Sequence, residues 1–251
     1  MNRIYPIAFF SLLVTSFPPP AQAENPDELI KRAKLIFGDD FNRNEDDEVN
    51  EQVGNGWVTN SANAADGVKQ ADLQNGTLVI TQAEGANHSV SVRHDAPFDD
   101  GVIKLRFQVF DKTGLKFNIN DPKANKVTWA GHIARVVLTP NFVTISDDKT
   151  GVYDLQVRSK RKSKNLGMEE QAELAKFLAT KSAKLKAPIK PKEWHEMTMV
   201  NIGPKFEVYI DDQLVGSFSS EGLDHKVKQN IALGVSGKVT VDDLRVWSLD
   251  Q

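Results

Sequence analysis

The chain of 251 residues has no cysteine, which excludes disulfides, a thiol nucleophile, thiolate zinc sites and iron–sulfur clusters. It also lacks an excess of either charge, because 31 basic residues face 34 acidic ones and the formal net charge is −3. Without a global positive field, we expect no nucleic-acid partner and no docking on an anionic membrane. Any chemistry is left to carboxylates, hydroxyls, basic groups and five histidines.

Long apolar runs are missing as well, since no stretch approaches the roughly 20 residues that a membrane-spanning helix needs. The start of the chain has a positive Met1–Arg3, a short apolar run over Ile4–Phe17 and small residues at Ala21–Ala23. This pattern is typical of a cleaved secretory signal peptide. We therefore expect residues 1–23 to be removed and the protein to be exported, to the periplasm or the cell exterior. Residues 24–251 have the length of one domain, and no membrane span is expected after cleavage.

Alternation of apolar and polar residues dominates the rest of the chain. In Ile103–Val109 every second residue is apolar, which places one face of a strand in the core and leaves the other wet. Turn sequences such as Asn75-Gly76 and Gly203-Pro204 separate such runs, and no helix alternates with them. The sequence predicts an all-β jelly-roll sandwich of two antiparallel sheets. Eleven stretches rich in Val, Ile, Phe and Thr are the expected strands: 77–81, 89–93, 102–110, 115–119, 132–139, 142–145, 196–202, 206–210, 214–218, 231–235 and 239–246.

Two helical segments are expected. Asn25 can cap a short helix that begins with Pro26 and ends by Phe37. The segment 158–192 holds eleven basic and three acidic residues, a local charge of +8, and it contains a helical insertion around 165–187. This insertion is either a basic arm for an acidic polymer or membrane surface, or a solvated helix that rests on the sandwich by its apolar stripe. The stripe consists of Leu174, Phe177, Leu178 and Leu185.

Short motifs follow one another through the chain in a specific order: Ile36–Phe41, Gly56-Trp57, Leu73–Leu78, Phe98–Gly101, Glu193–Glu196, Phe206–Val215 and Val241–Val246. In order and spacing they resemble the concanavalin A-like lectin/glucanase superfamily, and most of all its 3-keto-disaccharide hydrolase-like domains, which are related to family 16 glycoside hydrolases. The resemblance implies a curved jelly roll whose concave sheet or rim loops meet a carbohydrate. It specifies fold better than activity.

The catalytic carboxylates of family 16 glycoside hydrolases have no counterpart in this sequence. The E-x-D-x-x-E run of those enzymes, which supplies nucleophile and acid/base, is absent. The acidic cluster nearest to such a run, Glu45–Glu48 with Glu51, has the composition of a solvated loop. The resemblance to 3-keto-disaccharide hydrolase-like domains implies a central strand that carries a Glu, but the comparable stretch here, Gly131–Leu138, contains no acid. Enzymatic action is undecided, with His132 as the candidate acid/base.

Candidate carbohydrate-binding residues lie on two neighbouring strands. Lys116, Asn118 and Asn120 alternate with apolar residues and share one face. Either His132 or Arg135 joins them from the next strand, but not both. Side chains alternate between the two faces of a strand, so two residues that are three positions apart point to opposite faces. Trp129 in the preceding loop is the candidate stacking platform. The alternative is an ordinary solvated sheet face.

A cation site is a weaker expectation, and no cofactor is required. Oxygen-rich loops and two histidines could hold Ca²⁺, although turn-forming aspartates serving only the backbone explain the same pattern. The residues concerned are His88, His94, Asp95, Asp99 and Asp100, with Asp147 and Asp148 as the specific metal candidates.

Three functions remain open at this point: an exported glycan-binding module, a glycoside hydrolase or lyase of the 3-keto-disaccharide type, and a non-catalytic cell-envelope protein that uses its basic insertion. The first two have carbohydrate as their partner.

Overall fold

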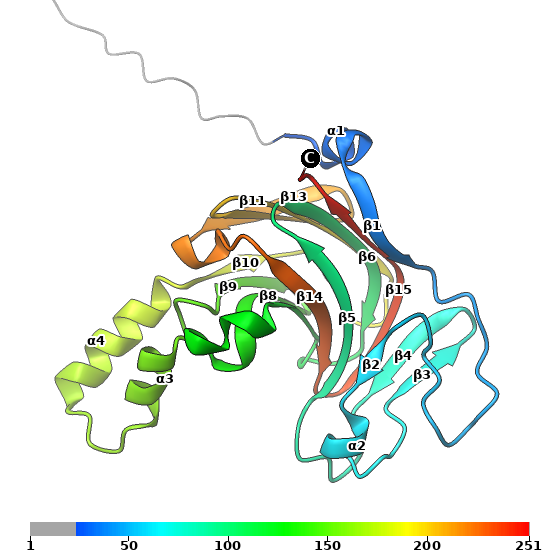
Figure 1. Cartoon of the computed structure of the whole chain (residues 1–251), viewed down its shortest axis with the longest axis horizontal. Coiled ribbons are helices and arrows are strands. Elements are labelled where there is room, and N and C mark those ends of the chain that lie inside the picture. Colours follow the sequence, from blue (N-terminus) through cyan, green and yellow to red (C-terminus); the bar gives the residue numbers. More distant parts are fainter. Residues whose placement is uncertain (1–23, 251) are drawn as a thin grey trace, which may run out of the picture.

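The computed structural model describes residues 24–250, so the predicted signal peptide at residues 1–23 lies outside the described residues. Two antiparallel sheets pack face to face and curve together, as the period-two pattern predicts (Figure 1). All eleven expected strands are confirmed. Over residues 24–250, no helix is long and apolar enough to cross a membrane.

Sheet A has eight strands. In spatial order they are β13 (Gln213–Ser219), β12 (Lys205–Ile210), β11 (His195–Ile202), β6 (Gly101–Val109), β15 (Lys238–Ser248), β4 (Thr77–Thr81) and β3 (Ala71–Gln74), with β1 (Lys34–Asp39) also paired to β15.

Sheet B has seven strands, and one face of it carries the pocket described below. In spatial order they are β10 (Ser182–Lys186), β9 (Phe142–Asp147), β8 (His132–Thr139), β7 (Leu115–Asn120), β14 (Lys228–Val235), β5 (Val90–Phe98) and β2 (Val58–Thr59).

The core lies between the sheets and is formed by alternate residues of their strands. On β6, Leu105 and Phe107 are completely buried, and Phe117 of β7 meets this core from the other sheet. The intervening residues of β7 are half-exposed, and they point to the opposite face of sheet B. Burial of one side of each sheet therefore fixes which side chains are available to a ligand.

Helices are short and lie outside the sandwich. α1 (Pro26–Arg32) is capped as predicted, because the Asn25 side chain accepts a hydrogen bond from the Asp27 N–H at 2.9 Å. The other single-turn elements are α2 (Ser61–Ala64), η1 (Pro122–Lys126), η2 (Trp129–Gly131) and η3 (Glu221–Leu223).

The basic insertion differs in detail from the expected single helix. It contains α3 (Leu155–Lys162) and α4 (Met168–Ala179), which form a hairpin that projects from the body (Figure 1). Neither helix has a buried residue, and Leu174 and Phe177 line a hollow of about 560 Å³ between the helices. Of the expected apolar stripe, Leu185 does pack against the core of the sandwich, but it does so from strand β10 and not from a helix. Residues after α4 return to the sheet as β10, because pairing with β9 satisfies their backbone.

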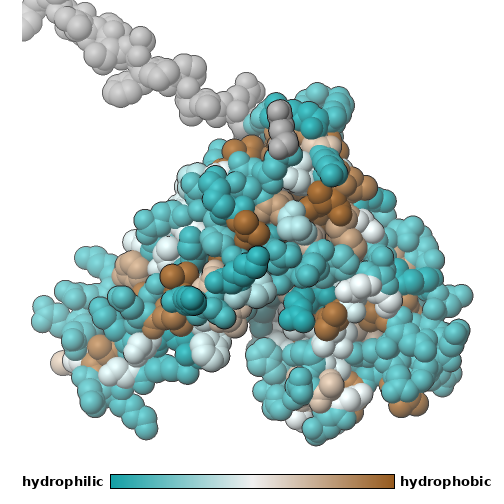
Figure 2. Space-filling model, viewed as in Figure 1, coloured by the Kyte–Doolittle hydropathy of each residue, from teal (hydrophilic) through white to brown (hydrophobic). Residues whose placement is uncertain are grey.

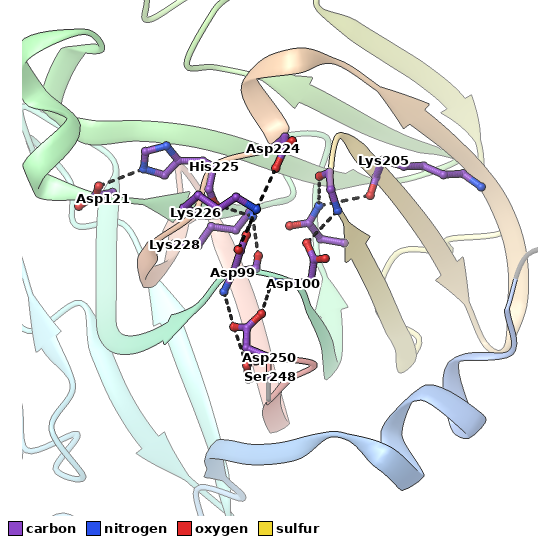
Figure 3. A network of polar contacts seen from close by, with 12 residues as sticks. Asp99, Asp100, Asp121, Lys205, Asp224, His225, Lys226, Lys228, Ser248 and Asp250 are labelled. Carbon is purple, nitrogen blue, oxygen red and sulfur yellow. Dashed lines mark hydrogen bonds and ion pairs between the residues drawn. The ribbon is translucent and has the colours of Figure 1, made fainter.

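Several elements converge at one end of the sandwich through a polar network (Figure 3). The Asp250 carboxylate accepts the backbone N–H groups of Asp99 and Asp100 at 2.7 and 3.1 Å. Lys228 is fully buried, and its Nζ donates to the carbonyls of Asp99 and His225 at 2.6 and 2.9 Å. Burial lowers the pKa of Lys228 to about 8, although the negative charges of the surrounding aspartates act to raise it. Asp99 and Asp100 thus hold the end of the chain to the sandwich.

Candidate functional site

A pocket of about 450 Å³ lies on the face of sheet B that points away from the core. Lys116, Asn118 and Asn120 of β7 line its floor, as their alternation along the strand predicts. Asn230 of β14 and Arg93 of β5 flank them. Figure 2 shows the molecule hollowed between the lobe of helices α3 and α4 and the lobe that carries β2, β3 and β4. The size suits a small ligand.

Both His132 and Arg135 line this pocket, so the prediction that only one of them shares the face is wrong. A β-bulge explains the difference. Asn118 lies opposite Arg135 and Asn120 opposite His132, with a register shift between them. The extra residue makes Ile133 and Ala134 consecutive buried positions, which regular alternation does not allow.

The rim of the pocket is held by a tight turn before β8. Ala130 and Gly131 both have positive φ, and a Cβ on Gly131 would lie 2.2 Å from the Asp121 carbonyl oxygen. Buried Thr128 donates its hydroxyl to the His132 carbonyl at 2.8 Å, which ties the turn to the strand. This turn sets Trp129 at the pocket edge, 47% exposed.

Two aromatic contacts complete the wall. The Tyr153 ring stacks on the His132 imidazole with 4.2 Å between centroids. The Arg158 guanidinium of α3 lies 3.7 Å from the centroid of Trp129, so one surface of that indole is already covered. Trp129 therefore joins the basic hairpin to the pocket rim and is not a bare stacking platform.

Burial and charge set the protonation state of the site. Burial lowers the pKa of His132 to about 4, and the positive charges of Arg135 and His88 act in the same direction. At neutral pH the imidazole is uncharged. Burial, with the charge of Arg135, also lowers the pKa of Lys116. The site disfavours additional positive charge.

A carboxylate lies directly behind the pocket. Asp148 is fully buried, and its Oδ1 accepts a hydrogen bond from Arg135 Nη2 at 3.0 Å. Burial raises the pKa of Asp148 to about 7, although the guanidinium opposes the shift. Its other oxygen, Oδ2, is buried without a hydrogen-bond partner among the described residues. Asp148 orients Arg135, and it is not itself part of the pocket lining.

The amide groups on the floor are fixed by neighbouring strands. Asn120 Nδ2 donates to the Asn230 side-chain oxygen at 3.0 Å, and Asn118 Nδ2 donates to the Lys116 carbonyl at 3.1 Å. Lys116 Nζ donates to Ser236 Oγ at 2.9 Å. Fixed donors and acceptors of this kind suit the recognition of sugar hydroxyls.

The metal candidates do not converge. Asp147 accepts bonds from Ser220 Oγ at 2.5 Å and the Gly222 N–H at 3.1 Å, while Asp148 faces Arg135. His88 lines the pocket, whereas His94 stacks on Phe37 elsewhere. Over residues 24–250, no group of three His, Asp or Glu side chains is arranged to hold a metal ion.

Sequence reasoning missed Tyr153, Arg93 and Asn230 as pocket residues. Asn230 falls just before an expected strand, at 231–235, and Tyr153 stands in the loop that precedes the insertion. Only Arg93 could have been predicted from the sequence. It lies on the expected strand 89–93, at one of the alternate positions that face away from the core.

Solved structures with this fold include carbohydrate-active proteins. The laminarinase from Rhodothermus marinus is 14% identical, with a TM-score of 0.54 over 86% of this chain and 97% of its own. The laminarinase from Flavobacterium sp. UMI-01 is 16% identical, with a TM-score of 0.53 over 85% of this chain and 100% of its own. A carbohydrate-binding module from Bacillus subtilis is 12% identical, with a TM-score of 0.50 over 80% of this chain and 98% of its own. These likenesses confirm the concanavalin A-like jelly roll.

The relationship in sequence is to one family. No curated protein matches this chain. The profile of the family described as the 3-keto-alpha-glucoside-1,2-lyase-like domain, in contrast, matches residues 38–246, nearly the whole of the sandwich together with its basic insertion. The chain therefore belongs to the family of 3-keto-alpha-glucoside-1,2-lyase-like domains.

Proposed function

We propose that this protein is an exported carbohydrate-binding domain that takes a sugar in the pocket on sheet B. The observation that carries the proposal is the set of fixed polar groups on the pocket floor, with Tyr153 and Trp129 at its wall. Amide and ammonium groups match sugar hydroxyls, and aromatic rings match the apolar faces of a pyranose.

The proposal favours binding over chemistry because of the state of His132. A general base works best when its pKa lies near the operating pH, and the pKa of His132 is about 4. An imidazole with that pKa is a good hydrogen-bonding group and a weak base. The neighbouring carboxylate, Asp148, is engaged by Arg135 and is absent from the pocket lining.

The test is a glycan array followed by calorimetry with the purified protein. Binding should weaken about tenfold in Asn118→Ala, since the amide is a fixed floor group. Gln213→Ala, an exposed change on sheet A, is the control and should bind like the wild type. Absence of binding to every saccharide, or equal loss in both variants, contradicts the proposal.

Membership of the family favours a second candidate, a lyase acting on α-glucosides oxidised at C3. The C3 carbonyl acidifies the C2–H bond, so a base removes that proton, the C1–C2 double bond forms, and the C1–O bond breaks as the leaving group takes up a proton. His132 is the base in this scheme, with Lys116 and Arg135 beside the developing enolate oxygen.

Incubation with a 3-keto-α-glucoside, followed by detection of the unsaturated product, tests this activity. Turnover that disappears in His132→Asn, while the variant keeps its fold by circular dichroism, supports the lyase. Binding without turnover in the wild type supports the binding module instead.

A further inference from the structure

The charged residues that line the pocket are all cations. Among the described residues that line it, Arg93, Lys116 and Arg135 carry permanent or near-permanent positive charge, and none is an aspartate or glutamate. A pocket built only for neutral sugars needs hydrogen-bonding groups, but it does not need several cations without counter-charges.

Two of these three cations have no ionic partner. Arg135 is paired with Asp148 at 3.0 Å, whereas Lys116 and Arg93 form no ion pair with any residue between 24 and 250. Lys116 is nonetheless held in place, because its Nζ donates to Ser236 Oγ at 2.9 Å and Ser236 in turn contacts Ser89 Oγ at 2.7 Å. An ammonium that is half-buried, oriented and unpaired is prepared for an anion from outside.

The positive region continues beyond the floor. Arg158 lies on Trp129 at the rim, in the middle of helix α3, whose last turn carries three further basic residues. On the opposite side, Asp95 appears in the adjoining hollow of about 360 Å³ that shares Arg93 with the pocket. Between Lys116 and the hairpin of α3 and α4, the positive charges therefore have no nearby acidic residue in the pocket lining. An acidic substituent of the ligand fits there.

We infer that the pocket selects a saccharide carrying an acidic group, with the anion seated against Lys116 and Arg135 and the chain leaving past Trp129 toward Arg158. This inference rests on the proposed carbohydrate function and specifies its ligand class. The shared chemistry is a negatively charged substituent on a sugar, which a uronic acid carboxylate or a sulfate ester supplies.

The experiment compares saccharides that differ only in charge. The protein, from residue 24 onward, is titrated calorimetrically with trigalacturonic acid and with its fully methyl-esterified form, which keeps the backbone and removes the charges. A sulfated galactan trisaccharide and its desulfated form separate sulfate from carboxylate. We expect the acidic member of at least one pair to bind at least about tenfold more tightly, as loss of a charge-assisted hydrogen bond predicts.

Matched variants locate the effect. Lys116→Gln should abolish most of the preference for the acidic member, whereas Lys34→Gln removes the same charge from an exposed position on β1 of sheet A and should leave it unchanged. The preference should also shrink between 50 and 300 mM salt in the wild type, since the anion is bound electrostatically.

Three results overturn the inference. They are equal affinity for the charged and uncharged members of both pairs, tighter binding of the uncharged members, or a charge preference that survives in Lys116→Gln. In each of these cases saccharide is still bound, so the proposed carbohydrate function stands. If neither these probes nor neutral glucans bind, the proposed function itself has failed and the inference falls with it.

Discussion

The buried carboxyl of Asp148 makes a quantitative prediction about stability and pH. Its side chain has no exposed surface, and burial raises its pKa from 3.8 to about 7. A carboxyl whose pKa is higher in the folded state binds more protons there than in the unfolded chain between these two values. The free energy of unfolding therefore falls as pH rises from about 4 to 7.

The magnitude follows from the two pKa values. Between pH 5 and 8, a group with pKa about 7 in the folded protein and 3.8 in the unfolded chain costs about 3 kcal/mol of stability. Asp148→Asn removes this titration and keeps the shape of the side chain. The difference in unfolding free energy between the wild type and Asp148→Asn should thus move by about 3 kcal/mol in favour of the variant from pH 5 to pH 8.

Urea unfolding followed by tryptophan fluorescence at pH 5, 6.5 and 8 measures this difference. Asp47→Asn is the control, because hydrogen bonds from Asn50 and Val49 lower the pKa of Asp47 to about 2 and it does not titrate in this range. The reasoning is refuted if Asp148→Asn and the wild type keep a constant difference across the three pH values, since Asp148 would then ionise in the folded protein as it does in water.

Three further predictions concern the pocket wall and the hairpin. In an NMR titration, the His132 ring signals should stay constant from pH 8 to about 5.5 and move only toward pH 4, because burial and the charge of Arg135 keep the imidazole neutral; a midpoint near 6.5 would contradict this. Gly131→Ala should lower the free energy of unfolding by roughly 1–3 kcal/mol in urea unfolding, since φ is +74° there and the new Cβ would meet the Asp121 carbonyl; unchanged stability would show that the turn relaxes without cost. Replacing residues 155–179 by a short Gly/Ser linker should shift the thermal midpoint by only a few degrees, because neither helix buries a residue, and a loss of cooperative unfolding would contradict the independence of the sandwich.

The fold was accessible from the sequence because one physical pattern repeats. β7, and β6 from Ile103 to Val109, alternate between buried and half-exposed residues, so their hydrophobic period specifies both the strand and its buried face. The sequence did not predict strand β10, for the opposite reason. Its residues Ser182–Lys186 are rich in lysine, alanine and leucine, which favour helices locally, and pairing with β9 overrides that preference. β2 has two residues and β3 has four, too few to display a period.

The candidate site was accessible in part for the same reason. Lys116, Asn118 and Asn120 follow from alternation alone. The joint presence of His132 and Arg135 does not, because it depends on a bulge that only the pairing of β7 with β8 reveals. The acidic loop also differs from its expected solvated state, since the Glu51 carboxylate accepts hydrogen bonds from Ser61 Oγ and the backbone of Gln70, at 2.6 and 2.8 Å. Long-range partners of this kind leave no local trace in a sequence.

Charge is the property that whole-chain arithmetic describes least well. A formal total of −3 argues against a polyanionic partner, yet the eleven basic residues of 158–192 are concentrated in one segment. Through Arg158 on Trp129, that segment meets a pocket whose own charged residues are all basic. Screening limits the reach of a charge to about 8–10 Å at physiological salt, so a ligand in the pocket responds to these neighbours and not to distant acids. Under the inference of an acidic saccharide ligand, the local field at the site, and not the net charge, decides which saccharide this domain prefers.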